Sequence, residues 1–312
     1  MGFNIYPFKL VCEFLTPACF PKYKGFSLRG AFGSAFRKVS CPVGFSVVCN
    51  NCLLRSNCAY FNVFDPVKQE NDYGKDVIRP FVLEPPYDEK RIYREKEEIC
   101  FNLIVFGEYV KYFPFFIMAF MEMGRKKIGI PEKRGSFILK KVLDREGNSL
   151  LANDKTSFKR PLVYRFNKIR KIGKVLKIVL VSPLRTKRYG HYVNPHNFSW
   201  ELFVEIVRRR LYLINQLYSV FEDSILREVD SLSECIVLKR RLFWKELERY
   251  SARQHTRMKM GGVSGYIEVA LPKGLRKKRS AARMLEIAEI LHLGKNTTFG
   301  LGKIAVKEVS DE

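Results

Sequence analysis

Residues 292–303 read HLGKNTTFGLGK and join the last predicted helix, Ser280–His292, to the last predicted strand, Gly302–Val309. Gly294 comes where that helix should stop, and the later glycines allow backbone N–H groups to approach a phosphate closely. The order of helix, glycine loop and strand is the reverse of that in a P-loop or a dinucleotide-binding fingerprint, so an ATPase or an NAD enzyme is disfavoured. A capping glycine followed by a glycine turn is the purely structural alternative.

Upstream of this loop, the second half of the chain alternates strands and helices. The predicted elements are strand Val175–Ser182, helix Trp200–Phe221, a segment from Cys235 to Tyr250, and strand Val263–Ala270. In the long helix, apolar residues recur at steps of three and four, which defines one buried face and places Arg208, Arg209 and Arg210 mainly elsewhere. The order β-α-(β)-β-α-β is that of a ferredoxin-like domain, and its second strand, near Cys235 to Leu238, is the least distinct.

The first half predicts another α+β unit. Its predicted elements are strand Phe8–Leu15, a helix capped by Ser27, strand Ile99–Phe106, helix Tyr109–Met123 and strand Ser136–Leu143. The buried face of the first helix consists of Leu28, Ala31, Phe32, Ala35 and Phe36. Residues 155–200 hold 12 Lys or Arg and no Asp or Glu, and the domain boundary is expected there, near residue 165. The domains are therefore 1–165 and 166–312.

The charge of the chain points to a polyanionic partner. Its 312 residues include 56 Lys and Arg against 32 Asp and Glu, a formal net charge of +24. Because 46% of the residues are hydrophobic, the chain has a core and is not a disordered basic tail. Nucleic acid is favoured over an anionic membrane surface. No export or lipid signal is visible, and the longest apolar run, Tyr112–Met121, is too short to span a bilayer, so we expect a soluble, cytoplasmic protein.

Five short segments, taken in order, resemble one protein family. They are Leu28–Gly33 ahead of a Cys cluster, Ser182–Arg185, Arg209–Leu211, Gly261–Gly265 and the loop Gly294–Gly302. Together they resemble the CRISPR-associated endoribonucleases of the RAMP superfamily, which process precursor CRISPR RNA. The resemblance implies an α+β fold of two tandem ferredoxin-like, RRM-like domains, with RNA on a basic face that touches the glycine-rich loop. It also implies metal-independent cleavage by the 2′-hydroxyl of the RNA, which leaves a 2′,3′-cyclic phosphate and a 5′-hydroxyl.

Such cleavage requires a base for the 2′-hydroxyl, an acid for the leaving oxygen and a cation beside the phosphate. The four histidines, His191, His196, His255 and His292, all lie in the second half, whereas many members of the family place the catalytic histidine in the first domain. His292 is the first candidate, with Lys295 three residues on, and a ring that only caps helix carbonyls or packs an interface is the alternative. His191 and His196 flank Pro195 in a predicted surface turn and are held in reserve.

His255 is the second catalytic candidate because it follows Tyr250-Ser251-Ala252-Arg253-Gln254, which resembles a family motif. Tyr250 or Arg253 is a candidate proton donor or phosphate clamp, and an RNA-facing segment without proton transfer is the alternative. The candidate RNA-binding residues are Arg253, Arg257, Gly294, Thr297, Thr298, Gly300, Gly302, Lys303, Arg185, Lys187, Arg188, Lys277 and Lys278.

The expected partner is the repeat of precursor CRISPR RNA, together with an interference complex that receives the product. The alternative function is that of a non-catalytic RAMP-type subunit, which keeps the basic face and needs no particular histidine. A metal-dependent nuclease is disfavoured because no carboxylates cluster with ligand spacing. Catalysis is therefore expected to need no cofactor.

Four of the eight cysteines fall within a short stretch. Cys41, Cys49, Cys52 and Cys58 follow the pattern C-x7-C-x2-C-x5-C. Four thiolates in one loop predict a tetrahedral structural zinc site, which would order a long connection in the first domain. Four free thiols or a disulfide are the alternatives.

Overall fold

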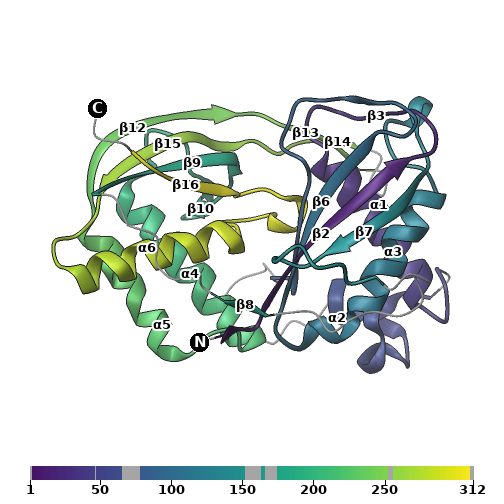
Figure 1. The fold of residues 1–312 in the computed structure, drawn as a ribbon, viewed down its shortest axis with the longest axis horizontal. Coiled ribbons are helices and arrows are strands. Elements are labelled where there is room, and N and C mark those ends of the chain that lie inside the picture. Colours follow the sequence, from purple (N-terminus) through teal and green to yellow (C-terminus); the bar gives the residue numbers. More distant parts are fainter. Residues whose placement is uncertain are drawn as a thin grey trace. The chain divides into compact units, whose positions relative to one another are not determined.

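The computed structural model of the protein describes residues 2–45, 47–64, 78–151, 163–165, 174–251 and 256–309. The chain divides into two compact units. Asn4–Tyr164 form the N-terminal unit, and Arg165–Glu312 with Met1–Phe3 form the C-terminal unit. Among the described residues, each unit contains one four-stranded sheet and two long helices (Figure 1).

The sheet of the N-terminal unit has the strand order β4-β6-β2-β7, with all neighbours antiparallel. Its main elements are β2 (Ile5–Phe14), α1 (Gly25–Ser40), β4 (Phe81–Glu84), β6 (Glu98–Phe106), α3 (Phe113–Arg125) and β7 (Phe137–Leu143). Numbered along the chain, the four main strands therefore lie in the order 2-3-1-4 across the sheet. One helix follows the first of these strands and one follows the third. This is the ferredoxin-like arrangement.

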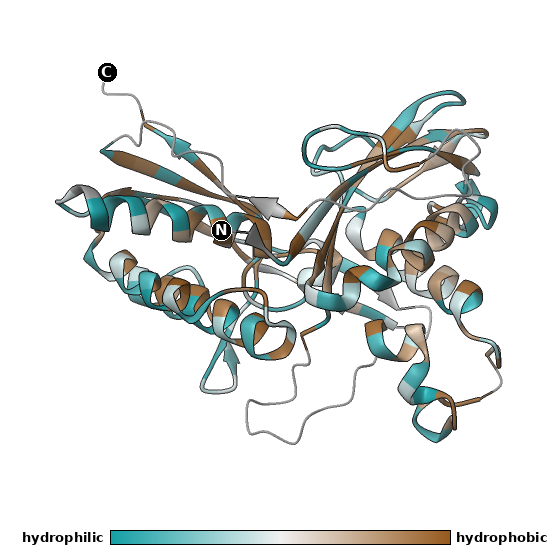
Figure 2. Cartoon of the chain, turned by 60° about the horizontal axis from the view of Figure 1, so that its bottom comes forward, coloured by the Kyte–Doolittle hydropathy of each residue, from teal (hydrophilic) through white to brown (hydrophobic). Residues whose placement is uncertain are grey.

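Phenylalanines hold α1 and α3 against this sheet. Phe36 of α1, Phe116 of α3 and Phe81 of β4 are fully buried. The ring centroid of Phe116 lies 5.2 Å from that of Phe36 and 5.7 Å from that of Phe81. Each buried aromatic side chain removes about 150–250 Å² from water, so this cluster contributes much of the stability of the unit. Figure 2 shows the resulting separation of hydrophobic and hydrophilic sides on the helices.

Two predicted helix boundaries of this unit are wrong. The N-cap of α1 is Lys24 and not Ser27, and the fully buried Lys24 Nζ donates to a carboxylate oxygen of Asp88 at 2.8 Å. The predicted helix Tyr109–Met123 is two elements, the 3₁₀ helix η3 (Gly107–Tyr112) and then α3. Proline lies in the first turn of α3, where its missing N–H leaves no bond unmade.

The C-terminal unit repeats the same topology. Its sheet order is β12-β15-β9-β16, again antiparallel throughout. The main elements are β9 (Val175–Leu184), α4 (Trp200–Tyr218), β12 (Ile236–Lys245), β15 (Gly262–Ala270), α6 (Leu275–Leu291) and β16 (Ile304–Glu308). The second strand, which the sequence left least distinct, is the ten-residue β12. Ser199 caps α4, because its hydroxyl accepts from the amide of Leu202 at 3.2 Å.

Shorter elements complete the two units. They are β1 (Gly2–Phe3), β3 (Ala18–Cys19), η1 (Cys49–Asn51), η2 (Arg55–Asn57), α2 (Ala59–Phe64), β5 (Ile92–Tyr93), η4 (Pro131–Lys133), β8 (Tyr164–Arg165), β10 (Lys187–Arg188), β11 (His191–Tyr192), α5 (Asp223–Arg227), η5 (Glu228–Glu234), β13 (Glu248–Ser251), β14 (Thr256–Lys259) and η6 (Thr297–Phe299). None of the helices in the described part of the chain combines the length and hydropathy of a membrane span.

Candidate functional site

The glycine-rich loop, residues 292–303, connects α6 to β16 through η6 and is fastened to the end of β9. The amide of Lys295 donates to the carbonyl of Arg185 at 2.8 Å, and the amide of Gly302 donates to the carbonyl of Pro183 at 3.1 Å. The buried Ser182 hydroxyl donates to the carbonyl of Gly300 at 2.8 Å and accepts from the amide of Lys303 at 2.9 Å. These bonds fix both ends of the loop on one strand.

Two glycines of the loop, Gly294 and Gly302, are required because backbone carbonyl oxygens lie where a Cβ atom would be. A Cβ at Gly302 would lie 1.8 Å from the carbonyl oxygen of Leu293, and a Cβ at Gly294 would lie 2.2 Å from that of Arg185. Both glycines have positive φ, +74° and +75°. The amides of Gly300 and Gly302 are bonded to the carbonyls of Thr297 and Pro183. In this conformation these two amides are therefore engaged within the loop and by β9.

His292 is enclosed rather than presented to a ligand. Its side chain has no exposed surface, and its Nδ1 lies 3.0 Å from the carbonyl oxygen of Leu301. Its backbone φ of 55° is strained for a residue with a Cβ, which indicates that the surrounding packing holds it. This burial does not support the predicted proton-transfer role, and the ring contacts a carbonyl of the loop rather than the helix carbonyls of the structural alternative.

Arg210 is a structural cation that sequence reasoning missed. It is 4% exposed, although the helical periodicity placed it mainly outside the buried face. Its guanidinium donates twice to the carbonyl of Leu291, at 2.9 and 3.2 Å, and once to the Thr297 hydroxyl at 3.1 Å. Burial lowers the pKa of the Arg210 guanidinium to about 10, so it stays charged at neutral pH. The only sequence signal was its place in the family-like Arg209–Leu211 segment.

Several predicted RNA-binding residues instead stabilise the unit. Arg185 is 5% exposed and donates to the carbonyl of Gly261 at 2.6 Å. Thr297 and Thr298 are each 7% exposed, so their hydroxyls are poorly placed for a surface ligand. The Lys303 ammonium donates to the carbonyl of Glu289 in the last turn of α6 at 3.1 Å. In this conformation these four side chains are therefore buried or bonded within their own unit.

An exposed basic hairpin, β10–β11, begins two residues after Arg185 and therefore lies beside the loop. It exposes Lys187, Arg188 and His191, with Arg188 paired to His191 across the ladder. Tyr189 at its turn is 87% exposed. Exposed cations interleaved with aromatic rings are the pattern by which proteins bind phosphates and stack on unpaired bases.

A second hairpin, β13–β14, also reaches the loop. The guanidinium of Arg249 lies 4.6 Å from the ring centroid of Phe299, and burial lowers its pKa. Tyr250 pairs with the exposed Arg257 across this hairpin. Arg253 and His255 lie outside the described residues. Lys295, in the loop itself, is half-buried, and burial lowers its pKa as well.

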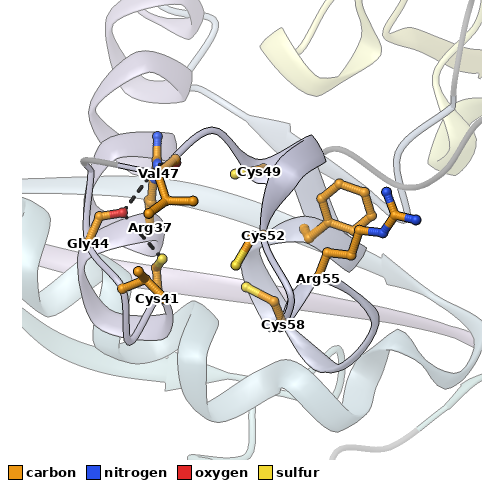
Figure 3. A pocket seen from close by; sticks show the side chains of 10 residues that line it. Arg37, Cys41, Gly44, Val47, Cys49, Cys52, Arg55 and Cys58 are labelled. Atoms are coloured by element: carbon orange, nitrogen blue, oxygen red, sulfur yellow. Dashed lines mark hydrogen bonds between the residues drawn. The ribbon is translucent and has the colours of Figure 1, made fainter.

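The remaining predicted residues lie elsewhere in their units. Lys277 is exposed and forms an ion pair with Glu234 at 2.8 Å, and Lys278 is half-buried beside it in α6. The four clustered cysteines line a single pocket of the N-terminal unit, which includes Arg37 and Arg55 (Figure 3). No three Cys, His, Asp or Glu side chains among the described residues are arranged as metal ligands, so the predicted tetrahedral site is not assembled in this conformation.

The close approach at Gly302 gives a stability prediction. Gly302→Ala should cost at least about 2 kcal/mol, because about 1 kcal/mol of backbone strain is added to an overlap with the Leu293 carbonyl. Gly274→Ala is the matched control, since Gly274 also has positive φ, +91°, but a Cβ there meets nothing within 4 Å. Urea unfolding followed by tryptophan fluorescence measures both variants, because the only tryptophans, Trp200 and Trp244, lie in the C-terminal unit. Equal losses in both variants would refute this close packing of the loop.

Two family models match this chain, and the boundary between them lies in the same region as the boundary between the two structural units. Residues 3–162, just over half of the chain, match the model of the AF_1859_N family, described as an N-terminal domain. Residues 178–304 match the model of the CRISPR-associated endoribonuclease Cas6. A protein of Archaeoglobus fulgidus that is named only as uncharacterized is 25% identical over 293 residues, which cover 92% of each chain.

Solved structures share the fold at low sequence identity. A Cas6 product complex gives a TM-score of 0.56 at 16% identity, covering 97% of this chain and 99% of that one. Cas6 of Thermus thermophilus gives 0.52 at 13% identity, covering 98% and 100%. A chain of a partial Cas6-RT-Cas1–Cas2 complex gives 0.59 at 13% identity, and this chain spans 98% of its own length but only 46% of that longer chain.

These structural matches confirm the predicted fold of tandem ferredoxin-like domains, and the Cas6 match confirms the family resemblance seen in the sequence. The chain therefore belongs to the AF_1859_N family, whose model matches residues 3–162, and its residues 178–304 match the model of the CRISPR-associated endoribonuclease Cas6.

Proposed function

We propose that this chain cuts precursor CRISPR RNA within its repeats and needs no metal for the chemistry. The observation that carries the proposal is the Cas6 match over residues 178–304, a range that contains both the fastened glycine-rich loop and the exposed hairpin beside it. In the proposed reaction, the 2′-oxygen attacks the adjacent phosphorus while the bond from phosphorus to the 5′-oxygen breaks. The products are a 2′,3′-cyclic phosphate and a 5′-hydroxyl.

Exposed cations of the C-terminal unit are proposed to hold the RNA backbone. Lys187, Arg188, Arg257 and Lys277 are exposed, whereas the buried Arg185 and Arg210 are bonded to carbonyls of their own unit. Because phosphate contacts release counterions, binding by these residues should weaken as the salt concentration rises. The buried cations contribute by holding the loop, not by touching RNA.

Proton transfer is proposed for a histidine other than His292. His191 is exposed and is paired with Arg188, so a base for the 2′-hydroxyl lies beside a cation for the phosphate. His255 remains a second candidate from the sequence. Lys295, whose pKa is lowered by burial, is proposed as a group that stabilises the developing negative charge.

A non-catalytic RNA-binding subunit is the second candidate function. The observation that favours it is the distribution of histidines, because residues 1–190 contain none and His292 is fully buried. Such a subunit would keep the exposed cations and the fastened loop. It would bind the repeat and leave it intact.

A cleavage assay separates these two functions. A labelled transcript with two repeats and a spacer should be cut once per repeat in EDTA, because the nucleophile is supplied by the RNA. Replacing the repeat 2′-hydroxyls with hydrogen should abolish cutting and leave binding within about 3-fold, since phosphate contacts provide most of the affinity. Circular dichroism in EDTA is the control for folding. Tight binding without cutting of the unmodified transcript would leave only the non-catalytic subunit.

Single-turnover rates of histidine variants test the proton-transfer assignment. His191→Asn should slow cleavage by about 100-fold or more, the usual effect of removing a general acid or base, with little change in affinity. His196→Asn is the matched control, because His196 is also exposed and lies in the next loop segment. His255→Asn is measured beside them. A normal rate for His191→Asn with a lost rate for His255→Asn would move the assignment to His255.

A further inference from the structure

The segment Cys41–Cys58 has no hydrophobic core of its own. None of its described residues is buried, and both of its 3₁₀ helices, η1 and η2, lack a buried residue. Its large apolar side chains face solvent, with Leu53 98% exposed and Val48 67% exposed. A connection of this length that buries so little apolar surface needs another source of order, such as a metal or a disulfide.

The side chains that do turn inward in this segment are mainly the cysteines. Cys41, Cys49, Cys52 and Cys58 are all half-buried and line one pocket, and Figure 3 shows their sulfur atoms turned toward the space between them. The cavity volume is about 10 Å³, close to the minimum for one water-sized guest. A single ion fits this space, whereas an organic ligand does not.

Two arginines of the same pocket bond to backbone carbonyls of the segment, and Figure 3 shows the guanidinium of Arg55 turned away from the sulfur atoms. Arg37 Nη2 donates to the carbonyl of Val47 at 2.8 Å, and Arg55 Nη1 donates to the carbonyl of Asn50 at 3.1 Å. Both line the pocket with the cysteines. Only the thiolate form of a cysteine binds metal.

The ends of the segment give the site a structural purpose. Cys41 is the C-cap of α1, and Cys58 directly precedes α2. Cys49 and Cys52 flank a single turn, with the amide of Cys52 bonded to the carbonyl of Cys49 at 3.2 Å. An ion held by all four would therefore tie the end of one helix to the start of the next.

We propose that Cys41, Cys49, Cys52 and Cys58 bind one Zn²⁺ in a tetrahedral structural site. Zinc is the usual ion for four thiolates, and its binding releases the thiol protons to solvent. The Cys41 Sγ is 3.4 Å from the carbonyl oxygen of Gly44, so it exchanges that weak bond for the metal. Because the described sulfurs are not arranged as ligands of one ion, they must move together when zinc binds, and the residues between them are mostly exposed.

The test measures metal in the purified full-length chain and does not use RNA, so its outcome is independent of the proposed cleavage activity. Elemental analysis should find about one zinc per chain. Replacement of zinc by Co²⁺ should give the thiolate-to-cobalt charge-transfer band and the visible bands of a tetrahedral site. Cys52→Ser should lose most of the bound metal. Cys100→Ser is the matched control, because Cys100 is also a half-buried free thiol but lies in β6, outside the cluster.

The unmodified protein keeps the test decisive even if Cys52→Ser fails to fold. A mercurial that reacts with the four clustered thiols should release the zinc, which a colorimetric chelator then detects. Before that release, these four thiols should be unreactive. Four thiols reactive from the start with no metal bound would overturn the proposal. Disulfides found by mass spectrometry within residues 41–58 would overturn it too, as would metal retained equally by Cys52→Ser and Cys100→Ser.

Discussion

The bonds between the end of β9 and the loop 292–303 are the constraint on which the C-terminal unit depends. The hydroxyl of Ser182 both donates and accepts, so it joins the carbonyl of Gly300 to the amide of Lys303 without leaving a buried polar atom unpaired. Arg210 adds a charge-assisted bond to the last carbonyl of α6. Because the chain continues from Arg185 directly into β10, the same bonds position the basic hairpin beside the loop.

The high net charge of the chain serves two physical purposes. Arg185, Arg210 and Lys303 bond to backbone carbonyls, so part of the positive charge neutralises helix ends and turns. The cations that remain exposed include those of the short hairpins, of β12 and of α6. Net charge therefore indicates the class of partner, but burial decides which residues are available to it.

The sequence predicted the regular elements well because their apolar periodicity is local. Strands such as β2, β6 and β9 and helix α4 lie within a few residues of the predicted ranges. The errors arise where distant segments meet. Lys24 stands at the N-cap position of α1 with its ammonium bonded to Asp88, and His292 is enclosed with its Nδ1 near the carbonyl oxygen of Leu301 across the loop. Likewise, Gly302 was assigned to phosphate binding because the backbone of Leu293 that it approaches cannot be located by spacing alone.

Cleavage by the RNA's own 2′-hydroxyl is the central step of the proposed function, and the chemical groups at the ends of the products test this step most directly. We would cut a single-repeat RNA with the purified protein in EDTA and weigh both fragments by mass spectrometry. The account predicts a 2′,3′-cyclic phosphate on the upstream fragment and a 5′-hydroxyl on the downstream fragment. A 3′-hydroxyl paired with a 5′-phosphate would contradict it, because that outcome requires attack by water on the phosphorus with loss of the 3′-oxygen.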